Sequence, residues 1–187
     1  MSVFAQNLAE HLELFQRLQV IETPVARAGE AMTAALQSGG KAMFCGNGGS
    51  AADSQHIAAE FTGRFINDRR PLAGLALSTD SSALTCISND YGYEHVFTRQ
   101  VQALGKPGDC LVGISTSGNS GNVISAFEYA RSVGIVTIGL LGRDGGALAA
   151  MSDIAIIVPS KVTARIQEAH ILIGHTLCGM VEDALVG

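Results

Sequence analysis

The sequence predicts an α/β fold, a three-layer sandwich in which a five-stranded parallel sheet lies between two layers of helices. The first observation is a series of five short apolar runs after residue 41, each of strand length. The second is that each run is followed by a segment of helical character, as a parallel sheet with helices on both faces requires. The third is a content of 47% hydrophobic and 16% charged residues, which indicates a well-buried core.

The first 40 residues are expected to form a helical hairpin that precedes the sheet. Apolar residues recur at three- and four-residue steps from Phe4 to Leu18, which is typical of a helix with one apolar stripe. Thr23 is expected to cap a second helix with Pro24 at its first position, and the pair Gly39-Gly40 is expected to end it. An apolar stripe needs a partner surface, so these N-terminal helices are expected to take part in oligomerisation.

The sheet and a terminal helix make up the rest of the expected single domain. A helix over residues 162–186 is apolar around most of its circumference, which indicates burial within the fold or within an oligomer. No linker or repeat interrupts the chain, so residues 1–187 are expected to form one domain, with 1–40 as the helical hairpin and 41–187 as the sheet core and terminal helix. The strands are expected at residues 42–45, 72–77, 110–114, 136–141 and 154–158.

Charge and cysteine content argue against several classes of protein. The formal net charge is -5 and no dense cluster of Lys and Arg occurs, which argues against a nucleic-acid partner. The opening residues include Glu10 and Glu13 where a secretory signal is apolar, and no apolar run is long enough to span a membrane, so a cytoplasmic location is expected. The four cysteines lack CxxC spacing and lie beside apolar residues, which indicates reduced core thiols: Cys45, Cys86, Cys110 and Cys178.

Two loops rich in glycine, serine or both follow the first and third expected strands, and each opens a helix. The first is Gly46-Asn47-Gly48-Gly49-Ser50, and the second is Ser115-Thr116-Ser117-Gly118-Asn119-Ser120. Glycine lets backbone N–H groups approach an anion, the helix N-terminus adds partial positive charge, and hydroxyl groups add donors. A phosphate monoester suits this combination, and ligands of parallel sheets bind at the carboxyl ends of the strands.

Other interpretations of the two loops stay open at this point. Either loop could serve only as a strand-to-helix turn. Residues 46–51 also fit the GxGxxA pattern of dinucleotide-binding folds, although Asp80, the acid after the next strand, lies well past the ~20-residue spacing of the ribose contact. Neither loop contains the lysine of a Walker motif. The sequence therefore favours a small phosphorylated metabolite over a nucleotide.

Polar residues on two expected helices could form a metal site. His56 and Glu60 are four residues apart, so both side chains face the same way beyond the first loop. Gln167, His170 and His175 interrupt the apolar terminal helix, where buried polar groups need a hydrogen bond or a metal ion. Such ligands suit a divalent cation such as zinc, whereas any single histidine can equally be a core residue bonded to a backbone carbonyl. Gln167 and His175 are ~12 Å of helix rise apart, so sharing one ion requires stretched side chains or neighbouring copies.

The combined motifs resemble those of the sugar isomerase (SIS) domain family and, within it, of the phosphoheptose isomerases. The resemblance covers nearly the whole chain. It implies a five-stranded parallel sheet with flavodoxin-like winding, a homotetramer, and active sites near the subunit contacts. It is carried by residues 45–50, His56-Ile57-Ala58-Ala59-Glu60, Thr62-Gly63-Arg64, Asn89-Asp90, residues 113–120, Arg165-Ile166-Gln167-Glu168, His170 and His175.

The resemblance also implies roles for individual residues. Glu60 is implied as the base and His175 as the acid of an aldose-ketose isomerase that interconverts sedoheptulose 7-phosphate and glycero-manno-heptose 7-phosphate through an enediol, the first step toward the heptose of lipopolysaccharide. Zinc or another divalent metal is implied at His56, Glu60, Gln167 and His175. The implied substrate-binding residues are Asn47, Gly48, Gly49, Ser50, Glu60, Asn89, Asp90, Ser115, Thr116, Ser117, Ser120 and Gln167.

A related group in the same superfamily offers an alternative function. The segments Leu77–Asp80 and Ala164–Glu168 resemble those of a non-catalytic SIS protein that binds the replication initiator DnaA. That relative lacks the counterparts of Glu60 and His175, and the presence of both residues here favours catalysis. Some isomerases carry Asp where this chain has Ala164, so any proton-transfer task of that Asp falls to another group here.

Overall fold

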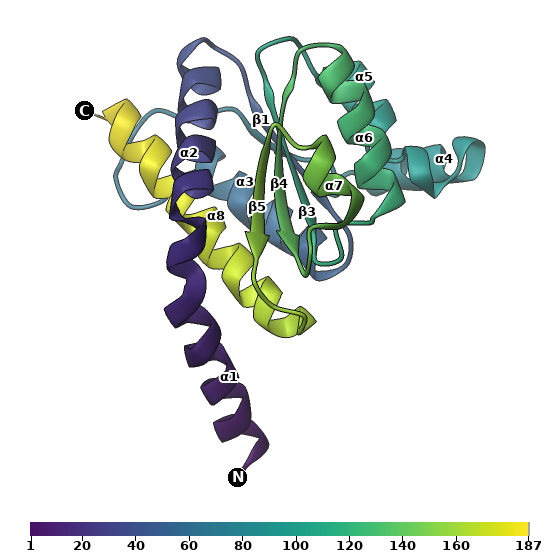
Figure 1. Ribbon diagram of the computed structural model, residues 1–187. Helices are drawn as coiled ribbons and strands as arrows, with labels where there is room; N and C mark the ends of the chain where they lie inside the picture. Colours follow the sequence, from purple (N-terminus) through teal and green to yellow (C-terminus); the bar gives the residue numbers. More distant parts are fainter. Residues whose placement is uncertain (187) are drawn as a thin grey trace.

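A computed structural model describes residues 1–186, apart from the side chain of Val186, and confirms the α/β sandwich (Figure 1). All strand pairs are parallel, and the order across the sheet is β2-β1-β3-β4-β5, the flavodoxin-like winding. Gly187, the last residue of the expected domain, lies outside the described residues. The strands are β1 (Ala42–Gly46), β2 (Gly74–Ala76), β3 (Cys110–Ser115), β4 (Val136–Gly142) and β5 (Ile154–Val158).

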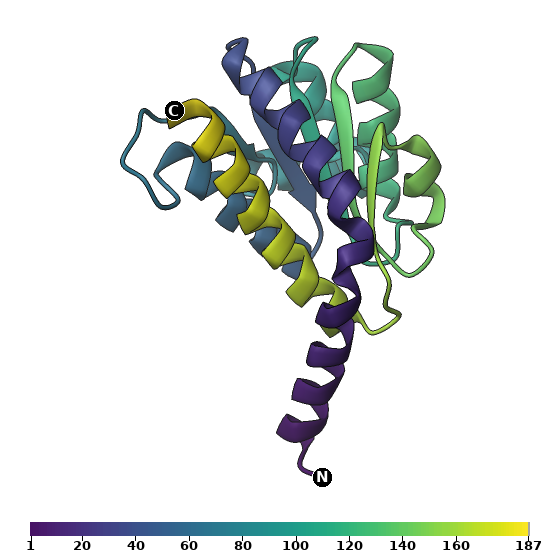
Figure 2. The same ribbon diagram turned by 60° about the vertical axis from the view of Figure 1, so that its left-hand side comes forward.

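The strands supply side chains to two hydrophobic clusters, because successive residues of a strand point to opposite faces of the sheet. Phe44 and Val112 belong to the cluster shared with α2, α3 and α8. Met43 and Leu111 belong to the cluster shared with α5, α6 and α7. Figures 1 and 2 show these helices as two layers on either side of the sheet. Their bounds are α2 (Glu22–Gln37), α3 (Gly49–Thr62), α5 (Thr98–Leu104), α6 (Gly121–Ser132), α7 (Gly146–Met151) and α8 (Thr163–Val186).

The second strand is shorter than the expected residues 72–77. Only residues 74–76 pair with β1, because the N–H of Leu72 donates to the carbonyl of Phe61 in α3 at 2.9 Å instead of joining the sheet. The other four strands agree with their expected bounds to within one residue. The apolar runs therefore located the sheet correctly, except at this edge strand.

The N-terminal helices do not form the expected hairpin. A short 3-10 helix, η1 (Leu18–Ile21), joins α1 (Val3–Arg17) to α2, and the chain continues in the same general direction (Figures 1 and 2). The expected cap is also wrong, since α2 begins at Glu22 and Thr23 lies inside its first turn. The reason is that η1 runs directly into α2 and leaves no extended residue to act as a cap. Pro24 remains in the first turn, where its missing N–H costs no hydrogen bond.

Helix α1 extends away from the sheet (Figure 2), and large apolar side chains of its stripe are exposed. The side of the helix that carries Phe4, Leu8 and Leu12 is open to solvent in the isolated chain, with Phe4 75% exposed. Contiguous exposed apolar residues of this kind mark an interaction surface. Within residues 1–186, the helices are too short or too polar to cross a lipid bilayer.

Three of the four cysteines are core residues, as expected. Burial raises the pKa of the thiols of Cys45, Cys110 and Cys178 to about 12, so they stay protonated and unreactive. Cys86 is exposed, which corrects the expectation for this residue. It lies on α4 (Ser81–Tyr91), a helix without buried residues that projects from the rest of the fold in Figure 1.

Candidate active site

The two expected phosphate loops lie next to each other, because β1 and β3 are neighbouring parallel strands and each loop follows a carboxyl end. In the second loop three hydroxyl groups come together: the Oγ of Ser115 is 2.8 Å from that of Ser120 and 3.5 Å from that of Ser117. Helix α6 begins directly after this loop, and its first N–H groups have no acceptor within the helix. Hydroxyl and backbone donors are thus concentrated where the oxygens of a phosphate can bind.

The backbone of the second loop is fixed by Gly118 and Asn119. Gly118 has a φ of +67°, and a methyl group at this residue would collide with the backbone carbonyl of Gly145. Only glycine fits this combination of left-handed backbone and close approach. The Asn119 side chain donates to the carbonyl of Ser117 at 2.9 Å and accepts from the N–H of Ala147 at 3.0 Å. Helix α7 therefore braces the loop.

A second group of polar residues lies where α3 and α8 pack together. The Nε2 atom of His56 is 2.9 Å from Nε2 of His175 and 3.6 Å from Oε1 of Glu60. The atoms of the three residues that can bind a metal all lie within 4.8 Å of one another. The helices approach closely because Gly174 packs on Ile57, and a methyl group at Gly174 would lie 2.7 Å from Cγ1 of that side chain. This contact brings His175 beside two residues that are more than a hundred positions away in the sequence.

The donor atoms of this triad fit a divalent metal ion. Two imidazole nitrogens and one carboxylate oxygen form the kind of three-residue set that holds catalytic zinc, with a further position left for water or substrate. Nitrogens bound to zinc at ~2.1 Å in a tetrahedral arrangement lie ~3.4 Å apart, close to the 2.9 Å between His56 and His175. The His56 side chain is 52% exposed, so the site is open to a ligand.

A buried carboxylate holds the segment that follows α3. Glu182 of α8 is 1% exposed and pairs with Nε of Arg69 at 3.1 Å. It also accepts three backbone N–H groups, from residues 65, 66 and 67, at 3.2, 2.9 and 2.6 Å. Burial acts to raise the pKa of Glu182, but the three N–H donors and Arg69 outweigh it and hold this pKa below its ordinary value. The carboxylate is therefore charged and fully bonded.

The same segment supports the triad. Arg69 donates to the backbone carbonyl of Glu60 at 2.7 Å, which fixes the end of α3 that carries a triad residue. The ring of Phe65 stacks on His175, with ring centroids 5.5 Å apart. Glu182, Arg69 and Phe65 thus connect the position of Glu60 to that of His175. No local sequence pattern indicates this role, because the partners of Glu182 are more than a hundred residues away.

Gln167 lies beside the first loop. A methyl group at Gly49 would lie 2.5 Å from Nε2 of Gln167, so the two residues are in close contact. Gln167 precedes His175 by eight residues on the same helix, or ~12 Å of rise. Within one chain, Gln167 is therefore placed to meet a ligand in the glycine loop.

The remaining expected site residues are scattered. Asn89 and Asp90 are exposed at the end of α4 and bond to each other at 2.7 Å. In the part of the chain that the structure describes, no hydrogen bond joins either of them to another expected site residue. Ser50 is buried under the first loop, where it packs against Gly46, and Thr116 is half-buried in the second loop.

Comparisons with known proteins identify the family of this chain. Residues 4–142 match the SIS domain family. The phosphoheptose isomerase of Rhodospirillum rubrum is 54% identical over 182 residues, which cover 97% of this chain and 95% of that protein. The chain belongs to the phosphoheptose isomerase group of the SIS domain family.

Solved structures of this group show the same fold as this SIS domain protein. The structure of phosphoheptose isomerase GmhA from Neisseria gonorrhoeae has a TM-score of 0.91 and 49% identity, and covers 96% of this chain and 97% of that one. A phosphoheptose isomerase from Francisella tularensis has a TM-score of 0.93 and 36% identity, and covers 98% and 100% of the two chains. The five-stranded sheet and its helices are therefore those of the family.

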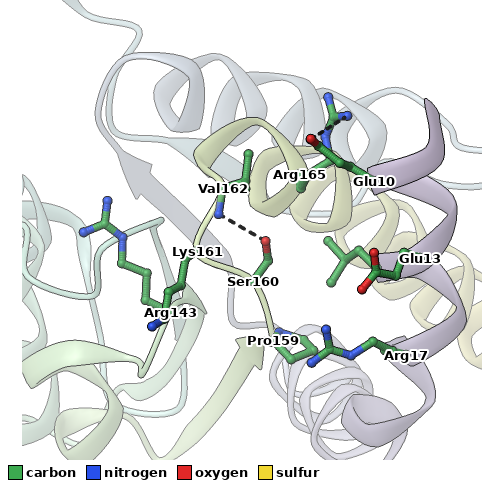
Figure 3. Close-up of a pocket in the computed structure, with 10 residues that line it drawn as sticks. Glu10, Glu13, Arg17, Arg143, Pro159, Ser160, Lys161, Val162 and Arg165 are labelled. Atoms are coloured by element: carbon green, nitrogen blue, oxygen red, sulfur yellow. Dashed lines mark hydrogen bonds and ion pairs between the residues drawn. The ribbon is translucent and has the colours of Figure 1, made fainter. Parts of the chain in front are cut away.

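This SIS domain protein also has basic side chains near the second loop that sequence reasoning missed. A cavity of about 480 Å³ lies between α1 and the segment that joins β5 to α8, and the expected site residues do not line it (Figure 3). A neighbouring cavity of about 460 Å³ shares Arg143 and Lys161 with it and reaches Ser117 and Asn119. Arg143 and Lys161 follow the carboxyl ends of strands β4 and β5. Because ligands of parallel sheets bind at these ends, this position could have identified both residues from the sequence.

Proposed function

We propose that this SIS domain protein is an aldose-ketose isomerase that interconverts D-sedoheptulose 7-phosphate and D-glycero-D-manno-heptose 7-phosphate. The observation that carries the proposal is the His56, Glu60 and His175 cluster, because two of its members lie on the helix that begins at the first anion-binding loop. Relatives about half identical to this chain bear the name phosphoheptose isomerase. The candidate base Glu60 therefore lies on the helix that begins at an anion-binding loop, and the candidate acid His175 approaches it from α8.

The reaction moves a proton between adjacent carbons of the open-chain sugar and needs one base and one acid. In the ketose-to-aldose direction, Glu60 removes a proton from C1 while His175 protonates the oxygen on C2, which gives the enediol. Glu60 then returns its proton to C2, and His175 takes the hydroxyl proton from the oxygen on C1. The aldose forms, both residues regain their starting protonation states, and no co-reactant is needed.

The phosphate end of the substrate is assigned to Ser115–Ser120. Binding of the phosphate there holds the reacting carbons near the acid and the base, so that proton transfer becomes effectively unimolecular. Helix α3 leads from the first loop to His56 over seven residues, or ~10 Å of rise, which sets the direction in which the sugar extends. Gln167, beside the first loop, is assigned to the substrate.

We assign a zinc ion or another divalent metal to His56, Glu60 and His175, whose donor atoms fit it. When bound, such an ion polarises the sugar carbonyl as a Lewis acid. Metal binding and base catalysis compete at Glu60, because a cation favours the ionised carboxylate and lowers its basicity. Glu60 therefore loosens its metal contact when it accepts the proton, or another group moves that proton. Gln167 can be a fourth ligand through a stretched side chain or from a second copy, given its distance along α8.

We also propose a homotetramer of single SIS domains, each spanning residues 1–187, in the cytoplasm. The support is the exposed apolar stripe of α1, with Leu8 45% and Leu12 53% exposed, and the nearby exposed Leu172 of α8. A stripe of this kind needs a partner to cover it. Sedimentation of the purified protein as a monomer would remove the proposal. The place of the reaction in lipopolysaccharide heptose synthesis follows from the substrate and is part of the same proposal.

The alternative function, a non-catalytic SIS protein that binds DnaA, has only the sequence likeness of two segments in its favour. The triad has no task in such a protein. A pull-down with purified DnaA, read beside the activity assay, separates the two functions.

The test is incubation of the purified protein with sedoheptulose 7-phosphate in deuterium oxide, followed by NMR of the products. We expect the aldose phosphate with deuterium at C2, since the proton on the base exchanges with solvent. Failure to form the aldose in metal-supplemented buffer overturns the proposed function. Elemental analysis of the wild type and of His56→Ala tests the metal assignment separately. Full turnover after complete chelation would refute the metal assignment and leave the proposed isomerase activity standing.

A further inference from the structure

Two residues that sequence analysis did not single out hold Asn47 in the first loop. The Nδ2 group of Asn47 donates to Oδ1 of Asn122 at 2.9 Å, and Nδ2 of Asn122 donates back to Oδ1 of Asn47 at 2.8 Å. The hydroxyl of Tyr93 donates to the same Asn47 oxygen at 3.0 Å. Asn122 comes from the first turn of α6 and Tyr93 from the 3-10 helix η2 (Tyr93–His95), so three separate segments meet at one carboxamide.

The Asn47 carboxamide has one hydrogen-bond donor left for a ligand. A carboxamide has two donor hydrogens and an oxygen with two lone pairs. The Asn47 oxygen uses both lone pairs and its nitrogen uses one hydrogen. One N–H group remains, and no acceptor remains. Asn122 is 4% exposed, so water does not compete for this pairing, whereas Asn47 is half-buried and can reach a ligand.

We propose that Asn122 and Tyr93 are positioning residues that lock Asn47 as a pure hydrogen-bond donor toward an acceptor oxygen of the sugar phosphate. The inference rests on the proposed function, which places Asn47 against the substrate. If Asn47 were free to rotate, its carboxamide oxygen would face the lone pairs of the ligand for part of the time and repel them. The reciprocal amide pair also ties the loop after β1 to the helix that follows the second loop.

Asn122→Asp tests the lock with little change in shape. The carboxylate cannot donate to the Asn47 oxygen and repels it, so Asn47 turns away from its donor orientation. We expect KM for the sugar phosphate to rise about tenfold, the effect of one lost hydrogen bond, with kcat within about threefold of wild type. Tyr93→Phe frees one lone pair only and should raise KM about threefold. The control is Glu128→Gln, a carboxylate-to-amide exchange on an exposed position of the same helix, which should leave KM unchanged.

A double-mutant cycle separates positioning from a general loss of structure. If Asn122 acts through Asn47, then Asn47→Ala combined with Asn122→Asp raises KM no more than Asn47→Ala alone. A merely structural role would lower the melting temperature and the folded fraction without this non-additivity. A wild-type KM in Asn122→Asp, or additive effects in the cycle, would overturn the proposal.

The same four proteins of the cycle are also measured by calorimetry, which gives their dissociation constants for sedoheptulose 7-phosphate. If the wild type binds this sugar but does not convert it, the proposed function fails while the cycle still judges the role of Asn122. If the wild type does not bind it, ligand-free crystal structures decide. A displaced Asn47 side chain in Asn122→Asp supports the lock, and an Asn47 side chain in its wild-type position refutes it.

Discussion

The two ends of the candidate site are built in different ways. The triad is carried by two packed helices, and one buried carboxylate, Glu182, bonds the segment that fixes both Glu60 and His175. The phosphate end consists of two loops in which small side chains, amides and hydroxyls bond to one another. Each of the three triad residues has a task that no neighbour can take over, so the loss of one removes the function of the whole triad. The loops offer many hydrogen-bond donors to the phosphate, so the loss of one donor leaves the others in place. Substitutions should therefore abolish turnover at the first end and weaken binding in steps at the second.

The largest effect is expected at the triad. Glu60→Gln and His175→Ala should each lower kcat about a thousandfold or more, because each removes a proton-transferring group. Both proteins should remain folded, as shown by circular dichroism, because neither residue lies in the hydrophobic core. Glu30→Gln, on an exposed position of α2, is the matched control and should keep wild-type kcat. Activity within tenfold of wild type in either triad variant would contradict the acid-base assignment.

The same contrast explains what could be predicted from the sequence. The four-residue spacing of His56 and Glu60 fixes a shared helix face, and the apolar runs fix the sheet, because both depend on periodicity along the chain. The approach of His175 depends on the contact of Gly174 with Ile57, which no local pattern encodes. The partners of Asn47 come from two distant segments for the same reason. The hairpin was wrongly expected because continuation through a 3-10 turn and reversal in a loop have similar apolar patterns.

The buried carboxylate should matter next most. Glu182→Gln leaves Arg69 buried without a counter-charge, so the free energy of unfolding should fall by about 3–5 kcal/mol. Urea denaturation measures this change, and elemental analysis should show weaker metal retention, since Glu60 and His175 lose their support. Arg131→Gln breaks an ion pair that is 46% and 43% exposed on its two sides, and should cost less than about 1 kcal/mol. Similar losses of unfolding free energy in the two variants would show that the buried Glu182–Arg69 pair has no special role.

His170 joins α8, the helix that carries His175, to the sheet, because its Nε2 donates to the carbonyl of Leu141 in β4 at 3.1 Å. Burial lowers the pKa of His170 to about 4 and outweighs the effect of that hydrogen bond, which raises it. Between pH ~6.5, the pKa in the unfolded chain, and pH 4, the unfolded chain binds more protons. Stability from this group is therefore complete above pH ~6.5 and is lost as the pH falls through that window, by up to about 3 kcal/mol.

The measurement is urea denaturation of the wild type and of His170→Gln at several pH values between 7 and 4. The difference between the two proteins isolates His170, since the other titratable groups are the same in both. We expect the curve of unfolding free energy against pH to be flatter for the variant. Parallel curves would show that His170 titrates with an ordinary pKa.

At the loop end the effects should be graded. Ser117→Ala and Ser120→Ala should each raise KM about tenfold with little change in kcat, because each removes one donor to a charged phosphate. Steady-state kinetics with the heptulose phosphate measures this split. Ser132→Ala, at the far end of α6, is the control and should keep the wild-type KM. An unchanged KM in both loop variants would place the phosphate elsewhere.

The smallest effect is expected for the cations beside the second loop. Arg143 and Lys161 share a cavity with Ser117 and Asn119, so they add positive potential at the expected phosphate position. Arg143→Gln and Lys161→Gln should each raise KM about threefold at low ionic strength, and the difference should fade as salt screens it. Arg17→Gln removes the same charge from the other cavity, which the second loop does not line, and should change KM less. Equal effects of all three substitutions would show that net charge, and not the position of these two side chains, attracts the phosphate.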